Sequence, residues 1–134
     1  NIIVKNAETK VQLYHHYDSY PEGVGRELQE EVFKSLSEDL AKKNDFLSSP
    51  SKAAEMLNEF STAYEIEGEI GLHGDIEYLY VIDLEEETIV CYDIWGWSET
   101  KSDEDCINGN GSTEKQVYFA SLWDEWEDIV VEEV

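Results

Sequence analysis

The stretch that most constrains the fold runs from residue 75 to residue 97, DIEYLYVIDLEEETIVCYDIWGW. Two apolar runs, residues 76–84 and 88–94, flank the glutamates Glu85, Glu86 and Glu87. Both runs are rich in Ile, Val, Tyr and Thr, which suit a pleated, packed surface. The first run is apolar on both of its alternating sides, which is typical of an inner strand. We therefore predict an antiparallel hairpin at the centre of a sheet, joined by a three-residue connection.

Three further segments show strand character. Residues 2–5 and 10–16 flank a short polar turn, so we expect them to pair as a terminal hairpin at the edge of the same sheet. Residues 65–70 alternate between acidic and apolar side chains, which indicates a short strand before the central hairpin. Residues 116–122 predict a last strand, and the acidic, Trp-containing segment after it is expected to turn helical.

Between the terminal hairpin and the short strand, the period of apolar residues becomes helical. A leucine or valine recurs every four residues from residue 28 to residue 40, which predicts a helix over residues 24–43. A loop is expected over residues 44–48. Ser49 followed by Pro50 is typical of a helix start, so a second helix should run to about residue 63.

Length and composition fit one domain that spans residues 1–134. A chain of 134 residues can bury a core of its own, and 41% hydrophobic content argues against wholesale disorder. The predicted class is α+β, with a mainly antiparallel sheet and two helices packed on one face. No apolar run approaches the roughly 18 residues needed to span a bilayer. We therefore expect a cytoplasmic protein without membrane contact.

The string Tyr14-His15-His16-Tyr17-Asp18-Ser19-Tyr20-Pro21-Glu22-Gly23-Val24-Gly25 is the most distinctive in the chain. It resembles a Tyr-x-His-x-Asp-Gly-Tyr-Pro-x-Gly-like string found in small, uncharacterised proteins of bacteria and their phages. Residues 75–92 look similar in that group too, whereas Ser19 stands here where a glycine is usual. The resemblance implies a strand, a turn and then a helix, and it implies no activity.

His15, His16 and Asp18 are the residues in this string that could bind a metal or transfer protons. Adjacent residues of a strand point to opposite faces, so His15 and His16 cannot both bind one ion without a kink. The only other histidine is His73, and no spaced set of Cys and His completes a zinc site. We expect a structural role, no cofactor and no metal. A small enzyme that uses His16 with Asp18 or a nearby glutamate is the alternative.

Two other candidate features are weak. Cys91 lies inside a predicted strand and is expected to be a small buried hydrophobe, and Cys106 has no obvious partner motif. Residues 103–105 are acidic, but Ile107 and Asn108 stand where a calcium-binding EF-hand loop needs Asp or Asn and then Gly. A looser calcium site at residues 103–105 stays open.

The net charge of −23 is the strongest functional clue, and it is unevenly distributed. Residues 1–52 contain nine acids and seven bases, whereas residues 53–134 contain 23 acids and two bases. Such a charge keeps a protein in solution but opposes its compaction through self-repulsion. Three explanations are open: a saline habitat, an acidic soluble protein without a basic partner, or an electric field that a partner recognises. Glu outnumbers Asp by 22 to 10, and the aliphatic residues are not depleted. Both observations disfavour the saline habitat.

The number of excess negative charges is comparable with that of a short stretch of nucleic acid. DNA exposes about one charge per 1.7 Å of axis, so a duplex as long as this domain is wide, roughly 36 Å, carries on the order of 21 phosphates. We therefore expect a DNA-mimic-type inhibitor rather than an enzyme, with a basic nucleic-acid-binding protein, such as a host defence nuclease, as its partner. Direct binding to nucleic acid is disfavoured because phosphates would repel the chain. The carboxylates predicted to face the partner are Glu85, Glu86, Glu87, Asp103, Glu104, Asp105, Asp124 and Glu125.

Overall fold

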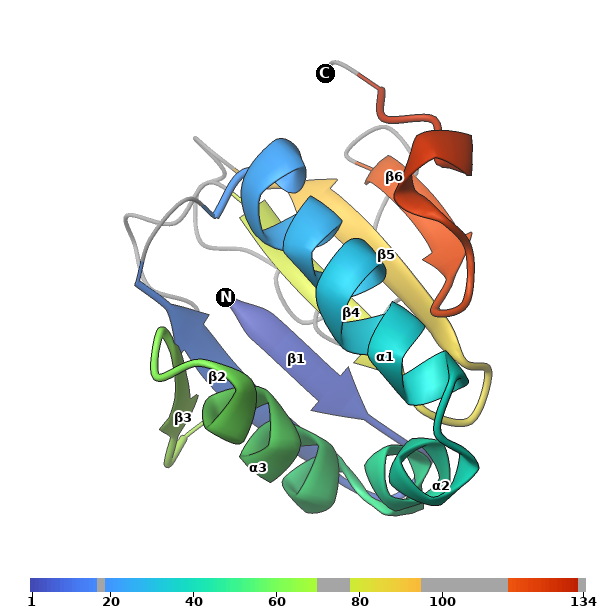
Figure 1. The fold of residues 1–134 in the computed structure, drawn as a ribbon. Coiled ribbons are helices and arrows are strands. Elements are labelled where there is room, and N and C mark those ends of the chain that lie inside the picture. The colour runs from blue at the N-terminus through green and yellow to red at the C-terminus, as the bar shows by residue number, and fades with distance from the viewer. Residues whose placement is uncertain (17–18, 70–77, 95–115, 133–134) are drawn as a thin grey trace.

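The computed structural model contains one six-stranded sheet with its helices on one side (Figure 1). The structure describes residues 1–16, 19–69, 78–94 and 116–132. The strand order is β3-β2-β1-β4-β5-β6, and only the β1–β4 pair is parallel. In chain order, the strands are β1 (Ile2–Lys5), β2 (Lys10–His15), β3 (Tyr64–Glu67), β4 (Tyr78–Asp83), β5 (Thr88–Asp93) and β6 (Gln116–Ser121). The expected α+β class with a mainly antiparallel sheet is confirmed.

The central hairpin forms as predicted, but its connection has four residues, 84–87, instead of the expected three, because β4 ends at Asp83. Strands β4 and β5 pair antiparallel from Tyr78↔Asp93 to Asp83↔Thr88. Tyr80 and Ile82 are 1% and 0% exposed, as expected for an inner strand. The connection includes Glu87 with a φ of 55°, a left-handed conformation that is uncommon for residues other than glycine. A tight turn therefore closes without the Asn-Gly or Asp-Gly pair that usually marks one.

The terminal hairpin lies inside the sheet, so its prediction as an edge was wrong. Strand β1 lies between β2 and β4, and β2 lies between β1 and β3. Ile2, Ile3 and Val4 are all 0% exposed, because β1 is covered on both faces of the sheet. Such two-sided burial is what a parallel inner strand needs. The short strand β3 pairs with β2 and forms one edge of the sheet, far from the central hairpin.

Among the described residues, three α-helices, two π-helical segments and one 3₁₀ turn accompany the sheet. They are η1 (Pro21–Gly25) and η2 (Leu28–Phe33), both wound as π-helix, α1 (Lys34–Ser37), α2 (Leu40–Ser48), α3 (Pro50–Phe60) and the 3₁₀ turn η4 (Trp126–Asp128). The predicted single helix over residues 24–43 is therefore wrong in extent. It stops at Ser37, and a new helix begins where Asp39 caps α2 by accepting a hydrogen bond from the Lys42 N–H. The expected loop over residues 44–48 belongs to α2.

The mixed α and π winding of residues 21–37 accommodates the four-residue repeat. A strict repeat of four drifts around an α-helix, which has 3.6 residues per turn. The π-helix forms i→i+5 hydrogen bonds and is wider, so its drift has the opposite sense, and the alternation of π and α turns over residues 21–37 keeps residues four apart near the side that faces the sheet. Val24, Leu28, Val32 and Leu36 are accordingly all buried. The next member of the repeat, Leu40, follows the break and is 70% exposed.

Helix α3 begins as predicted and ends earlier than predicted. The Ser49 side chain accepts a hydrogen bond from the Lys52 N–H, and Pro50 occupies the first turn. The helix buries Ala53 and Leu57 and ends at Phe60, which is 44% exposed. The chain then extends, so that Tyr64 is buried from strand β3 instead of from a helix.

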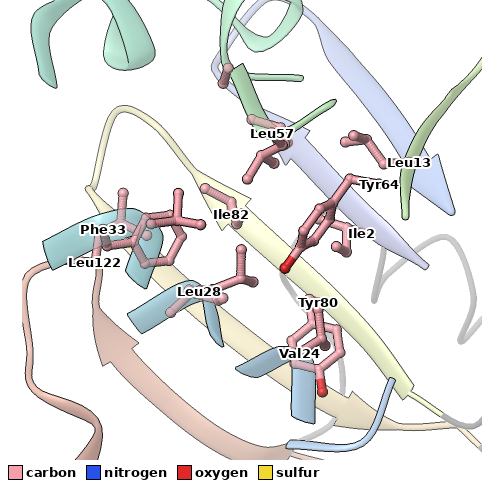
Figure 2. Packing of buried hydrophobic residues seen from close by; sticks show 14 of the residues in the cluster. Ile2, Leu13, Val24, Leu28, Phe33, Leu57, Tyr64, Tyr80, Ile82 and Leu122 are labelled. Atoms are coloured by element: carbon pink, nitrogen blue, oxygen red, sulfur yellow. The ribbon is translucent and has the colours of Figure 1, made fainter. Parts of the chain in front are cut away.

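The core has two parts, one on each face of the sheet. Figure 2 shows the larger part, where side chains of the helical segment 21–37 and of α3 pack onto the strands. Leu28 and Phe33 come from the helical side and Tyr80 and Ile82 from the central strand. The smaller part lies on the opposite face and consists of Ile3, Leu79, Val81, Val90, Tyr92 and Ile94. Cys91 is 0% exposed within the larger part, which confirms its prediction as a buried hydrophobe.

Candidate functional site

Two acidic segments that are far apart in the sequence lie at the same end of the sheet. The first is the turn between β4 and β5, residues 85–87, which we call the acidic turn. The second follows β6 and contains Asp124 and Glu125. Antiparallel pairing of β5 with β6 places Thr88 opposite Ser121. The Leu122 N–H then donates to the Glu87 carbonyl over 2.9 Å, so the two segments are in direct contact.

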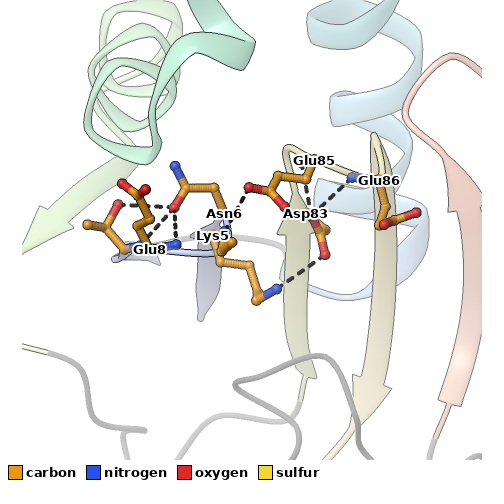
Figure 3. A network of polar contacts seen from close by, with 8 residues as sticks. Lys5, Asn6, Glu8, Asp83, Glu85 and Glu86 are labelled. Carbon is orange, nitrogen blue, oxygen red and sulfur yellow. Dashed lines mark hydrogen bonds and ion pairs between the residues drawn. The ribbon is translucent and has the colours of Figure 1, made fainter.

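The acidic turn is fixed to its surroundings by side-chain hydrogen bonds (Figure 3). The Asp83 carboxylate accepts from the N–H groups of Glu85 and Glu86 at 3.0 and 3.2 Å, and from Lys5 Nζ at 3.2 Å. The Ala7 N–H donates to Glu85 Oε1 over 3.1 Å, which joins the acidic turn to the turn between β1 and β2. Parallel pairing of β1 with β4 makes this link possible, because it brings the ends of both strands together.

The segment after β6 is held by Gln29 of η2. Gln29 is 2% exposed, and its side-chain Nε2 reaches the carbonyls of Ser121, Leu122 and Asp124 at 3.3, 3.4 and 2.8 Å. The Asp124 carboxylate in turn accepts from the Ser121 N–H at 3.0 Å. This buried amide therefore positions the whole turn that carries Asp124 and Glu125.

A groove of about 590 Å³ runs between the η2–α1 helical segment and the turn after β6. We call it the acidic groove. Among its described lining residues, six are acidic and one, Lys34, is basic. The acidic ones are Glu30, Glu31, Glu38, Asp124, Glu125 and Glu127. A second groove of about 440 Å³, between η2–α1 and helices α2 and α3, has a mixed lining that includes Lys42 and Lys52.

Carboxylates crowd each other at the rim of the acidic groove. A hydrogen bond with Glu125, followed by the negative charges of Glu125 and Asp128, raises the pKa of the exposed Glu127 carboxyl. Such a shift is expected where like charges share a small region, because each disfavours ionisation of the other. The rim is therefore a place where an incoming cation would relieve repulsion.

Two tryptophans line the acidic groove and differ in their surroundings. The Trp123 indole N–H donates to Glu87 Oε1 over 2.9 Å, and Lys43 Nζ lies 4.3 Å from the centroid of the Trp123 ring. Trp126 is half-buried and meets the Tyr118 ring edge-to-face at 5.6 Å. The groove thus combines carboxylates with aromatic surface, and Trp123 already holds one internal cation by a cation–π contact.

The predicted interface residues fall into three groups. Glu85, Glu86, Asp124 and Glu125 are exposed, although Glu85 and Asp124 also hold their turns in place. Glu87 is half-buried against Trp123. Asp103, Glu104 and Asp105 lie outside the described residues.

Sequence reasoning missed four carboxylates of the groove. Glu30, Glu31, Glu38 and Glu127 are not among the residues predicted to face the partner. Only the packing of η2–α1 beside the turn after β6 brings them together. Their local acidity was visible in the sequence, but that long-range packing was not.

The histidines of the distinctive string lie on opposite faces, as predicted. His15 is buried and packs edge-to-face on Tyr64 at 4.6 Å between ring centroids. His16 is exposed, and its Nε2 lies 2.6 Å from Glu65 Oε2. No group of three or more His, Cys, Asp or Glu that could hold a metal occurs among the described residues, which exclude Asp18 and His73.

Comparisons with protein-family models, with curated proteins and with solved structures find no match for this chain. Within the described part of the chain, no helix is long and apolar enough to cross a membrane.

Proposed function

We propose that this chain is an acidic inhibitor of the DNA-mimic type. It occupies the basic groove of a nucleic-acid-binding protein, such as a host defence nuclease, and excludes the nucleic acid from it. It acts by binding and catalyses no reaction. It needs no cofactor, contacts neither nucleic acid nor membrane directly, and meets its partner in the cytoplasm.

The observation that carries this proposal is the meeting of two acidic segments at one end of the sheet. Glu85 and Glu86 of the acidic turn and Glu125 of the turn after β6 are exposed there. Two bases at this end are already engaged: Lys5 pairs with Asp83, and Lys43 lies over the Trp123 ring. The acidic groove extends the negative surface toward η2–α1.

The fixed geometry of this end supports a binding role. Asp83, Gln29 and Glu87 hold both turns through hydrogen bonds, so their carboxylates are in place before a partner arrives. Binding to a preorganised surface costs less conformational entropy than binding to a mobile one. A concentrated negative field also accelerates encounter with a basic partner.

The experiment is a pull-down from host lysate at low salt with elution by a salt step, followed by competition. A labelled DNA duplex is bound to the recovered protein, and the chain is titrated in. We expect the chain to displace the duplex, and we expect displacement to weaken as salt rises, because exposed charges are screened beyond about 8 Å at physiological ionic strength.

A matched pair of variants tests the surface. Glu85→Gln, Glu86→Gln and Glu125→Gln together should slow association with the recovered protein. Neutralising Glu22, Glu55 and Glu59 changes the net charge equally at exposed helical positions away from the acidic turn. This control should have a smaller effect. Equal effects of the two variants, or a partner that binds indifferently to salt, would contradict the proposal.

A further inference from the structure

A residue of the acidic groove lining, Gln29, carries a buried acceptor without a partner among the described residues. Gln29 lines this groove and is 2% exposed. Its Nε2 is bound by backbone carbonyls of the turn after β6, whereas its Oε1 has no hydrogen-bond partner among the described residues. An unsatisfied buried acceptor costs free energy, and a donor that displaces the adjoining side chains and reaches it would recover that cost.

The rest of the lining fixes what kind of donor fits. Glu125 and Glu127 are exposed carboxylates around the same groove, Glu30 beside them accepts from Arg26 Nε over 3.0 Å, and Trp126 contributes aromatic surface. The donor should therefore be cationic, able to make several hydrogen bonds at once and able to stack. A guanidinium group meets all three requirements, with five donors in a planar fork and weaker hydration than an ammonium.

We infer that the acidic groove receives an arginine side chain of the basic partner, with its guanidinium shared between Gln29 Oε1 and the carboxylates of the groove. This inference rests on the proposed function and names the partner chemistry that the groove selects. The volume of about 590 Å³ accommodates the arginine together with neighbouring atoms of the chain that carries it. The bound arginine would also relieve the repulsion between Glu125 and Glu127, which adds to the favourable free energy of binding.

The test uses two capped peptides, Gly-Gly-Arg-Gly-Gly and Gly-Gly-Lys-Gly-Gly, titrated into the full chain and followed by ¹⁵N NMR. The Arg peptide should bind more tightly than the Lys peptide. It should also shift the side-chain amide signal of Gln29 and the indole signal of Trp126. Shifts confined to other regions, or equal affinity for the two peptides, would overturn the inference.

Variants that keep the fold then separate the effect of the groove carboxylates on binding from the effect of the net negative charge. Glu125→Gln with Glu127→Gln should weaken binding of the Arg peptide about tenfold, because ionised acceptors form hydrogen bonds about twice as strong as neutral ones. Glu22→Gln with Glu55→Gln is the control of equal charge and should have a clearly smaller effect. Lys34→Met removes the one basic residue of the described lining and should strengthen binding. Equal losses in the groove variant and the control would contradict the inference.

Its failure and the failure of the proposed function are distinguishable. If the Arg peptide shows no preference while the recovered partner is still lost on neutralising Glu85, Glu86 and Glu125, the inhibitor proposal stands and the arginine site falls. If the Arg peptide binds as expected but no DNA-binding protein is displaced from its duplex, the inhibitor proposal falls and only the chemical selectivity of the groove remains.

Discussion

Trp123 donates its indole N–H to the Glu87 carboxylate over 2.9 Å, and this contact joins the two acidic segments of the chain. Glu87 is also the residue with a φ of 55°, so its left-handed backbone conformation sets the direction of the side chain that Trp123 contacts. A carboxylate that is held by a neutral donor keeps its charge while its position is fixed. The contact thus links the geometry of the central hairpin to the negative surface at the end of the sheet.

Replacing Trp123 by Phe should destabilise the protein by about 1.5–3 kcal/mol, the range for a hydrogen bond to a charged group. The loss includes the indole N–H bond to Glu87 and weakens the contact with Lys43. Urea unfolding monitored by circular dichroism measures the change. Glu87→Gln keeps an acceptor and should cost less. If Trp123→Phe and Glu87→Gln are independent in a double-mutant cycle, the hydrogen bond is not what joins the segments.

Gly25 should tolerate no side chain unless Tyr118 changes with it. A Cβ atom at Gly25 would lie 2.8 Å from the Tyr118 hydroxyl oxygen and 3.4 Å from the Trp126 ring. That hydroxyl is buried and has no hydrogen-bond partner among the described residues. We expect Gly25→Ala to destabilise by about 1–3 kcal/mol, the usual cost of overpacking.

The Tyr118→Phe variant provides the control for this clash. It removes the oxygen that the new Cβ would meet, so Gly25→Ala should be much less costly in the Tyr118→Phe background. Tyr118→Phe alone should be nearly neutral or stabilising, because the hydroxyl that it removes is unsatisfied. Thermal unfolding of the four proteins gives the coupling. An additive result would show that the hydroxyl is not the obstacle.

The central hairpin could be predicted because its signal is local, whereas the position of β1 could not. Residues 78–93 carry long runs of strand-forming residues on both faces, and Tyr80 and Ile82 are buried accordingly. Strand β1 has four residues, too few to distinguish an edge from an inner strand. Its burial depends on a parallel partner that lies 78 residues further along the chain, at Ile2↔Tyr80.

The helices illustrate the same limit at shorter range. The repeat from Leu28 to Leu36 predicts the buried face, but it continues to Leu40 across a break that the period does not reveal. The break depends on Asp39, because an aspartate can either cap a helix or occupy an exposed position inside one. In the candidate site, the acidic segments were visible in the sequence, and the groove formed by Glu30 and Glu127 required the tertiary structure.

The buried tyrosines predict alkaline unfolding. Burial, and for Tyr64 a hydrogen bond with Glu27, raises the pKa of Tyr64, Tyr80 and Tyr118 well above the ordinary value. A raised folded-state pKa means that the neutral phenol is favoured in the fold. Its stabilising effect is complete below the unfolded pKa of about 10 and is lost as pH rises above that value.

Ionisation of these three tyrosines, measured by tyrosinate absorbance, should therefore coincide with unfolding of the chain, measured by circular dichroism, above pH 10. Tyr64→Phe and Tyr118→Phe should each lower the tyrosinate signal that accompanies unfolding by one residue. If all eight tyrosines of the chain ionise before the circular dichroism changes, the buried environment of the three is contradicted.

His15 and His16 should not bind a transition metal. His15 is buried against Tyr64, and His16 points to the other face, where its Nε2 meets Glu65. Two imidazoles held on opposite faces cannot share one ion. Calorimetry with zinc should show no binding tighter than about 1 μM, equivalent to about −8 kcal/mol. Tighter binding that disappears in His16→Ala would contradict the assignment of both side chains to the structure.

Salt should stabilise this protein on its own, because its charge of −23 opposes compaction. Neutralising Glu85, Glu86 and Glu125 removes three exposed charges from one end of the sheet, and the amide replacements keep the acceptor that Glu85 offers to the Ala7 N–H. The melting temperature of this variant should therefore equal or exceed that of the parent at low salt. The difference should shrink as salt rises, because screening removes the repulsion in both proteins. A lower melting temperature at every salt concentration would mean that these carboxylates hold the fold together, and a loss of partner binding in the variant could then no longer be attributed to charge.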